Sequence, residues 1–272
     1  MSHLIRGLMA VILVVGVLSG CGGSDSSYEV TTTVASGAGT NDITVWGPSG
    51  DGPWPVVYAV PGLDGATGSA VRDFDVFADE LASHGVVVIG TDLTSARVDV
   101  DVECGYRYAQ EAGSDYGGDP SLPVTFLGYS AGATGALING LGEDAYGPEG
   151  TVSVPCPPGT ERPQTIVSLN GCHTTYTEVE SRVRNWGNQD AMITLISGAD
   201  DDVCPPRESI AAQELLTEAG YNAAYVEIPD ANHWEIIFHD LSYGTYKTLE
   251  PDDPAGQATV QAVLDAIGIS NE

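Results

Sequence analysis

The stretch GYSAG at Gly128–Gly132 is the part of this chain that decides its fold. It follows the apolar, strand-like run Pro123–Leu127 and precedes an Ala/Leu-rich run with the composition of a helix. A serine on a tight turn between a strand and a helix has its hydroxyl held clear of the sheet, and small neighbours let the two elements approach it. GxSxG also occurs by chance in glycine-rich chains, as an ordinary turn. The flanking strand and helix favour a nucleophile elbow, with Ser130 as the nucleophile.

A serine nucleophile needs a base to take its proton and a carboxylate to orient that base. On a strand–turn–helix elbow the three residues follow the order serine, acid, histidine. Three histidines follow Ser130, and the first, His173, precedes every plausible acid loop. His233 lies on a Pro/Asp/Asn-rich turn after the strand-like run Ala224–Ile228, so we expect it to be the base. We expect His239 to lie in a surface loop.

Three adjacent aspartates follow the strand-like run Met192–Ser197 and compete for the role of the acid. Asp201 and Asp200 are the two candidates. Asp202 is expected to be a solvated surface charge, because the protein is acidic throughout.

An acyl-transfer site also needs hydrogen-bond donors for the oxygen that becomes negative in the tetrahedral intermediate. The backbone N–H of Ala131 directly follows the predicted nucleophile and is one candidate. The second donor is expected on the loop after an early strand. Leu63 N–H is that candidate, in the sequence PGLDG after the strand-like run Val56–Val60. Pro-Gly is also a general turn signal, so a purely structural turn is the alternative.

With these residues identified, the chain resembles the α/β-hydrolases, and within them the branch of dienelactone hydrolases, cutinases and polyester hydrolases. The likeness runs from about Asp42 to Ile267 and is carried by VPGL at Val60–Leu63 and FADELASHGVVVI at Phe77–Ile89. It implies one α/β domain with a mostly parallel eight-stranded sheet, helices on both faces, and serine-dependent ester hydrolysis. It also places Asp201 on the aspartate of the family's Gly-x-x-Asp-x-x-x-Pro acid loop, with Asp200 as the alternative.

Two aromatic residues next to the predicted triad are candidates for substrate contact. Trp234 follows the predicted base and Tyr129 precedes the predicted nucleophile; either could line an acyl or alcohol pocket, and either could be core packing. Asn170 and His173 follow the strand after the elbow helix and are expected to face the cleft. The elbow has Tyr129 and Ala133 where many polyester hydrolases have His and Gly, so the resemblance does not imply a polyester substrate. No Arg or Lys stands out as a carboxylate clamp, which favours neutral esters.

The first 20 residues have the layout of a secretory signal peptide, with Arg6 before the apolar run Leu8–Leu18. This run is too short to span a membrane comfortably. The sequence LSGC at Leu18–Cys21 resembles a bacterial lipobox. The resemblance implies export, a lipid anchor on Cys21 and a place on the extracytoplasmic face of the cell membrane; a signal without lipid is the alternative. Residues 21–27 are then a flexible Gly/Ser tether, and residues 28–272 form the hydrolase domain.

Four cysteines remain after Cys21, an even number that suits two disulfides in an exported protein and allows three pairings. Two of them follow consecutive strand-like runs, and if those strands are neighbours the two thiols meet at the same edge of the sheet. The expected pairs are therefore Cys172–Cys204 and Cys104–Cys156. No CxxC or histidine cluster has the spacing of zinc ligands, and no HExxH, P-loop or GxGxxG follows a strand, so no metal or other cofactor is expected.

The formal net charge is −29, from 38 acidic and 9 basic residues, with Lys247 the single lysine. Such a surface repels nucleic acid and anionic head groups, so nucleic-acid binding is not expected. It suits a protein of high-salt surroundings or simply an acidic exported protein. Roughly 250 mature residues suit one domain, and we expect a monomer. The stretches Gly140–Pro163 and His173–Gln189 are expected to border an open active-site mouth without a large lid.

Three functions remain open from the sequence. The first is an extracytoplasmic serine esterase, and the second is a serine peptidase or acyltransferase that uses the same triad. The third is a surface-anchored, non-catalytic binding lipoprotein on a hydrolase fold. The filled catalytic positions favour an enzyme over the third.

Overall fold

The computed structural model describes residues 28–35, 42–62, 74–93, 98–142, 161–173, 187–241 and 247–269. The expected signal peptide and tether, Leu63 and Cys156 lie outside these ranges, as do most of the two stretches expected at the active-site mouth.

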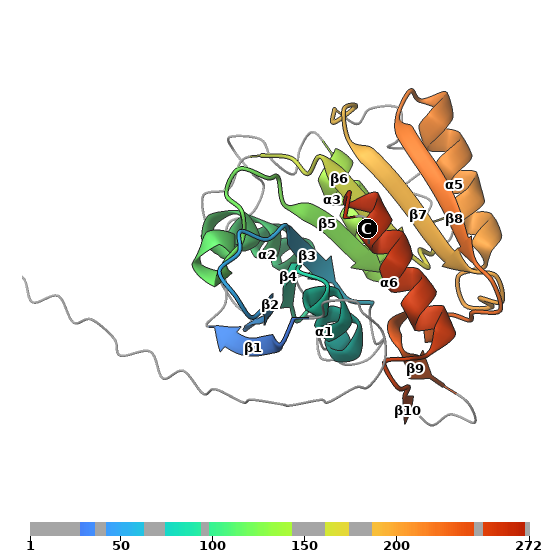
Figure 1. Cartoon of the computed structure of the whole chain (residues 1–272). Helices are drawn as coiled ribbons and strands as arrows, with labels where there is room; N and C mark the ends of the chain where they lie inside the picture. Colours follow the sequence, from blue (N-terminus) through green and yellow to red (C-terminus); the bar gives the residue numbers. More distant parts are fainter. Residues whose placement is uncertain are drawn as a thin grey trace, which may run out of the picture.

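One eight-stranded sheet forms the centre of the molecule, with the strand order β1-β2-β4-β3-β5-β6-β7-β8 (Figure 1). The strands are β1 (Val30–Ala35), β2 (Ile43–Pro48), β3 (Val56–Val60), β4 (Val87–Thr91), β5 (Thr125–Tyr129), β6 (Thr165–Leu169), β7 (Met192–Gly198) and β8 (Asn222–Ile228). β2 is antiparallel to β1 and β4, and all other pairings are parallel. Every residue of β3, β4, β5 and β6 is buried, as expected for parallel strands that are covered on both faces. The predicted mostly parallel eight-stranded sheet is confirmed.

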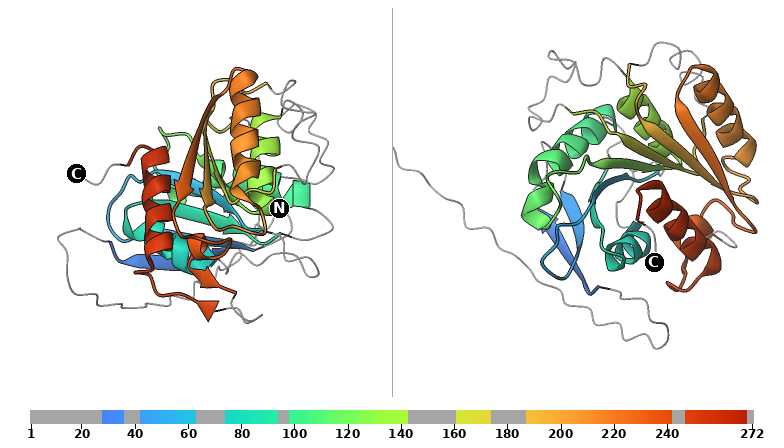
Figure 2. Two further views of the ribbon diagram at one scale, coloured as in Figure 1. Left: turned by 90° about the vertical axis from the view of Figure 1, so that its right-hand side faces the viewer. Right: turned by 45° about the horizontal axis from the view of Figure 1, so that its top comes forward.

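Helices cover both faces of this sheet (Figure 2). The helices are α1 (Asp75–Ser83), α2 (Val98–Ala112), α3 (Ala131–Leu141), α5 (Pro206–Glu218) and α6 (Pro254–Ala266). Two separate hydrophobic clusters form between them and the sheet. One includes Tyr106 of α2, Leu137 of α3 and Leu216 of α5, and the other includes Phe77 of α1 and Val263 of α6. The chain therefore folds as helix, sheet and helix layers, with α1 and α6 on one face of the sheet.

The described residues also form short elements, one of which corrects an expectation. They are the 3-10 turns η2 (Gly113–Tyr116) and η4 (Glu235–Ile237) and the pair β9 (His239–Asp240) and β10 (Lys247–Thr248). His239 begins β9 and is only 4% exposed, so the prediction of a surface-loop histidine was wrong. At the start of α6, the Asp253 carboxylate accepts the N–H groups of Ala255 and Gly256 and caps the helix.

Among the described residues, no helix combines the length and the apolar character that a bilayer crossing needs. Within the same ranges, no three His, Cys, Asp or Glu side chains are grouped closely enough to hold a metal ion.

Candidate active site

Ser130 lies on the sharp turn between β5 and α3, with φ 54° and ψ −121°. A non-glycine residue in this region is strained, and such strain is typical of functional sites. Close packing around the turn explains its small neighbours. A Cβ on Gly128 would overlap the backbone of Gly132, and a Cβ on Gly132 would overlap the carbonyl oxygens of Val60 and Pro61. Two glycines of the GYSAG pattern therefore let β5, α3 and the end of β3 meet at the serine.

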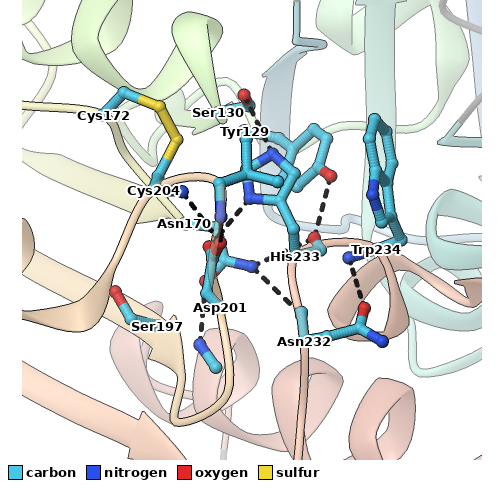
Figure 3. A network of polar contacts seen from close by, with 12 residues as sticks. Tyr129, Ser130, Asn170, Cys172, Ser197, Asp201, Cys204, Asn232, His233 and Trp234 are labelled. Atoms are coloured by element: carbon cyan, nitrogen blue, oxygen red, sulfur yellow. Dashed lines mark hydrogen bonds and ion pairs between the residues drawn. A yellow bond between two sulfur atoms is a disulfide. The ribbon is translucent and has the colours of Figure 1, made fainter. Parts of the chain in front are cut away.

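The three residues predicted as a triad form one hydrogen-bonded chain (Figure 3). His233 Nε2 lies 3.1 Å from Ser130 Oγ, and His233 Nδ1 lies 2.8 Å from Asp201 Oδ2. His233 and Asp201 are 2% and 4% exposed, whereas Ser130 is half-buried. With the proton on Nδ1 donated to Asp201, Nε2 is an acceptor for the serine hydroxyl. This geometry can move a proton from Ser130 to His233.

Asp201 is held in place by the loop that follows β7. Its Oδ1 accepts the N–H groups of Val203 and Cys204, each at 2.8 Å, while its Oδ2 faces His233. Asp200, the alternative acid, contributes its backbone N–H to Ala231 O at 2.9 Å. The structure thus brings Asp201, rather than Asp200, to the histidine.

A disulfide joins Cys172 to Cys204, with the two Cα atoms 4.7 Å apart. It links the segment after β6 to the loop that carries Asp201 (Figure 3). Cys104 is also disulfide-bonded. Its expected partner, Cys156, lies outside the described residues.

Ala131 is the first residue of α3, and N–H groups in the first turn of a helix have no acceptor within that helix. Its N–H therefore fits the expected oxyanion donor. Gly62 packs against the elbow so closely that a Cβ there would lie 3.0 Å from Ser130 Cβ. Leu63, the other predicted donor, follows Gly62 directly and lies outside the described residues.

The two aromatic candidates differ in their surroundings. Tyr129 is 3% exposed, packs edge-on against Phe74, and donates its hydroxyl to the His233 carbonyl at 2.8 Å. It is therefore core packing, the alternative that the sequence left open. Trp234 is partly buried, and its ring meets that of His233 edge to face at 5.1 Å. Substrate contact by Trp234 stays a prediction.

Asn170 and His173 are both buried, so the expectation that they face the cleft was wrong. The turn that carries His233 was predicted from the sequence, but the hydrogen bonds that close it were not. Asn232 Oδ1 accepts the N–H groups of Trp234 and Glu235, and Glu235 Oε2 accepts the N–H of Asn232 at 2.9 Å. This reciprocal pattern is a capping box, and the Asn-x-x-Glu spacing at Asn232 was its signal in the sequence.

His173 is expected to make the fold sensitive to acid. Burial lowers the pKa of His173 from 6.5 to about 4, while Nε2 contacts Ser168 Oγ at 2.9 Å. At a pH between these two pKa values, His173 binds a proton in the unfolded chain and not in the folded chain, so falling pH favours unfolding. Between pH 7 and 5 this group should remove about 2 kcal/mol from the free energy of unfolding. Urea unfolding of wild type and His173→Gln at both pH values tests this; equal losses in the two proteins would contradict it.

The similarities of this chain to known proteins lie in its structure. No protein-family model and no curated protein sequence matches the chain. A propionate-bound esterase from the Planctomycetes species Thermogutta terrifontis is similar in structure, with TM-score 0.60, 17% identity, and coverage of 85% of this chain and 91% of that one. Thermogutta terrifontis esterase 2 phosphorylated by paraoxon gives TM-score 0.63, 16% identity and coverage of 89% and 96%. A truncated carbohydrate esterase from gut microbiota gives TM-score 0.58 and 16% identity, with coverage of 79% of this chain and 92% of that one. These likenesses show that the chain has the α/β-hydrolase fold.

Proposed function

We propose that this protein is a serine hydrolase that cleaves carboxylic esters. One observation carries the proposal: a strained serine on the elbow, a buried histidine and a buried aspartate form one hydrogen-bonded chain. The structural neighbours, which include an esterase and a carbohydrate esterase, support the same reaction class.

In this proposal, Ser130 Oγ attacks the ester carbonyl carbon while His233 Nε2 takes the hydroxyl proton. Asp201 orients the imidazole and stabilises its charged form. The N–H of Ala131, with Leu63 N–H as the second expected donor, holds the oxygen that becomes negative. The C–O bond to the alcohol then breaks, and His233 gives its proton to the leaving oxygen. Water, deprotonated by His233, cleaves the acyl-enzyme; the acid leaves and Ser130 regains its proton.

The preferred substrates in this proposal are neutral esters with short acyl chains. The net charge of −29 disfavours anionic substrates. Propionate and butyrate are bound in two of the structural neighbours, which supports short acyl groups as the first to test. Serine peptidases and acyltransferases use the same triad, so amide and acyl-transfer substrates belong in the same panel.

The test is to expose the purified full-length chain to a fluorophosphonate probe and to p-nitrophenyl propionate and butyrate, in low and in molar salt. We expect covalent labelling that peptide mapping places on Ser130, together with turnover of the esters. The salt series also tests whether the acidic surface is an adaptation to high salt. Absence of both labelling and turnover in every salt would contradict the esterase and favour a binding lipoprotein.

We also propose that the protein is exported and anchored by lipid on Cys21, at the extracytoplasmic face of the cell membrane. The signal-like residues before Cys21 and the lipobox-like sequence support this. In a bacterial host, the wild-type chain should appear in the membrane fraction and Cys21→Ser should not. Equal amounts of both proteins in the membrane fraction would contradict the anchor.

A further inference from the structure

We propose that Asn170 is a positioning residue that fixes the backbone of the base, His233, relative to the nucleophile and the acid. The proposal rests on the proposed esterase function and goes beyond it. Asn170 follows β6, is completely buried and has φ 44°. Asparagine tolerates this left-handed conformation better than most residues, yet it remains uncommon outside glycine.

The side chain of Asn170 connects β7, the strand that precedes Asp201, to the turn that carries His233 (Figure 3). Its Oδ1 accepts the N–H of Gly198 at 2.8 Å, three residues before Asp201. Its Nδ2 donates to the carbonyl oxygen of His233 at 3.0 Å and lies 3.3 Å from that of Asn232. The orientation of the amide is unambiguous, because Gly198 N–H can only donate and the two carbonyls can only accept.

The backbone around Asn170 extends the connection to the nucleophile. Asn170 N–H donates to Ile196 O at 2.8 Å, and the preceding carbonyl, that of Leu169, accepts Ser130 N–H at 2.9 Å. The end of β6 therefore contacts the nucleophile turn on one side and β7 on the other. Through Asn170, this rigid edge also holds the turn of His233.

Tyr129 supplies a second hydrogen-bond donor to the carbonyl oxygen of His233. Its hydroxyl donates to the His233 carbonyl at 2.8 Å, so that oxygen accepts bonds from β5 and from the end of β6. A carbonyl oxygen has two acceptor sites, and these two donors occupy both. The 3.1 Å separation of His233 Nε2 and Ser130 Oγ thus depends on two donors that never touch the substrate.

Asn170→Gly tests the proposal directly, because glycine accepts the positive φ and the substitution removes the side chain that makes these hydrogen bonds. We expect kcat for p-nitrophenyl butyrate to fall about 10- to 100-fold, because small displacements of catalytic groups have effects of this size. KM should change less than about threefold, since no substrate contact is lost. The rate of fluorophosphonate labelling should fall with kcat.

Asn188→Ala is the matched control. The Asn188 amide also donates to two backbone carbonyls, those of Gly140 at 3.0 Å and Pro163 at 2.8 Å, away from the triad. Both variants lose such bonds, so both should lower the melting temperature, and only Asn170→Gly should lower kcat and labelling. Equal kcat in the two variants would assign Asn170 a merely structural role and overturn the proposal.

A double-mutant cycle with Tyr129→Phe supplies a second test. Each single variant leaves one donor on the His233 carbonyl, whereas the double variant leaves that buried oxygen with neither. We expect the double variant to lose more kcat than the product of the two single losses. If the loss of kcat in the double variant equals the product of the two single losses, the two donors act independently, which would contradict their shared role at the His233 carbonyl. Tyr129→Phe combined with Asn188→Ala should show no such coupling.

Asn170→Asp covers the case in which Asn170→Gly does not fold. The substitution has the same shape and keeps an acceptor for Gly198 N–H, but puts a carboxylate oxygen in place of the donor to His233. We expect a similar loss of kcat at neutral pH, and unchanged kcat would overturn the proposal. Unreactive wild type would instead signal that the esterase function itself is wrong. Reactive wild type with normal Asn170 variants would contradict only the positioning role.

Discussion

Ser130→Ala is expected to lower kcat for ester hydrolysis by about 10⁶-fold, to the residual rate that an oxyanion hole and binding alone supply. The change removes the only atom of the triad that would bond to the substrate. His233 and Asp201 would remain hydrogen-bonded to each other at 2.8 Å, so the loss reports the nucleophile alone. Stopped assays with p-nitrophenyl butyrate measure the rate, and the fluorophosphonate probe should no longer label the protein.

Ser209→Ala is the control for this prediction. Ser209 is a buried serine of α5 that accepts a hydrogen bond from Ser197 Oγ at 2.8 Å and takes no part in the proposed reaction. It should keep wild-type kcat and wild-type labelling. Turnover by Ser130→Ala at more than about one hundredth of the wild-type rate would mean that another group is the nucleophile.

The sequence was sufficient to predict the fold and the three residues that meet at the site. The elbow pattern singled out Ser130, the chain order of the fold excluded His173 as the base, and the turn after Ala224–Ile228 favoured His233 over His239. Alternating apolar runs and helical patterns located the strands of the sheet, because buried parallel strands read as continuous apolar segments. These signals come from residues that are close together in the sequence, and the folded chain keeps the elements that they predict.

The contacts that hold the site could not be predicted, because they join residues far apart in sequence. Asn170 and His233 are 63 positions apart, and nothing near Asn170 marks its amide as a partner of a distant carbonyl. The burial of His239 had the same cause: its environment is set by neighbours of other elements, which a turn-rich local sequence does not reveal. The Asn232 capping box, in contrast, was readable and was missed.

Asp201→Asn is expected to lower kcat by about 10⁴-fold while leaving the fold intact. The asparagine has the shape of the aspartate and can still accept the N–H groups of Val203 and Cys204, which lie 2.8 Å from Oδ1. Its amide would face His233 Nδ1 as a donor, so the imidazole would adopt the tautomer with the proton on Nε2. That nitrogen could then no longer take the proton of Ser130.

Asp200→Asn is the matched control, because it neutralises the adjacent carboxylate in the same loop. The hydrogen bond that Asp200 contributes at 2.9 Å comes from its backbone N–H, which the substitution keeps. We expect its kcat to stay within about twofold of wild type, since charges of the acid loop other than Asp201 do not contact the imidazole. Purified proteins should be compared at the same pH and salt, with circular dichroism to confirm folding. If Asp200→Asn loses the activity and Asp201→Asn keeps it, then Asp200 is the acid in solution and the Asp201–His233 hydrogen bond is not the one that orients the base.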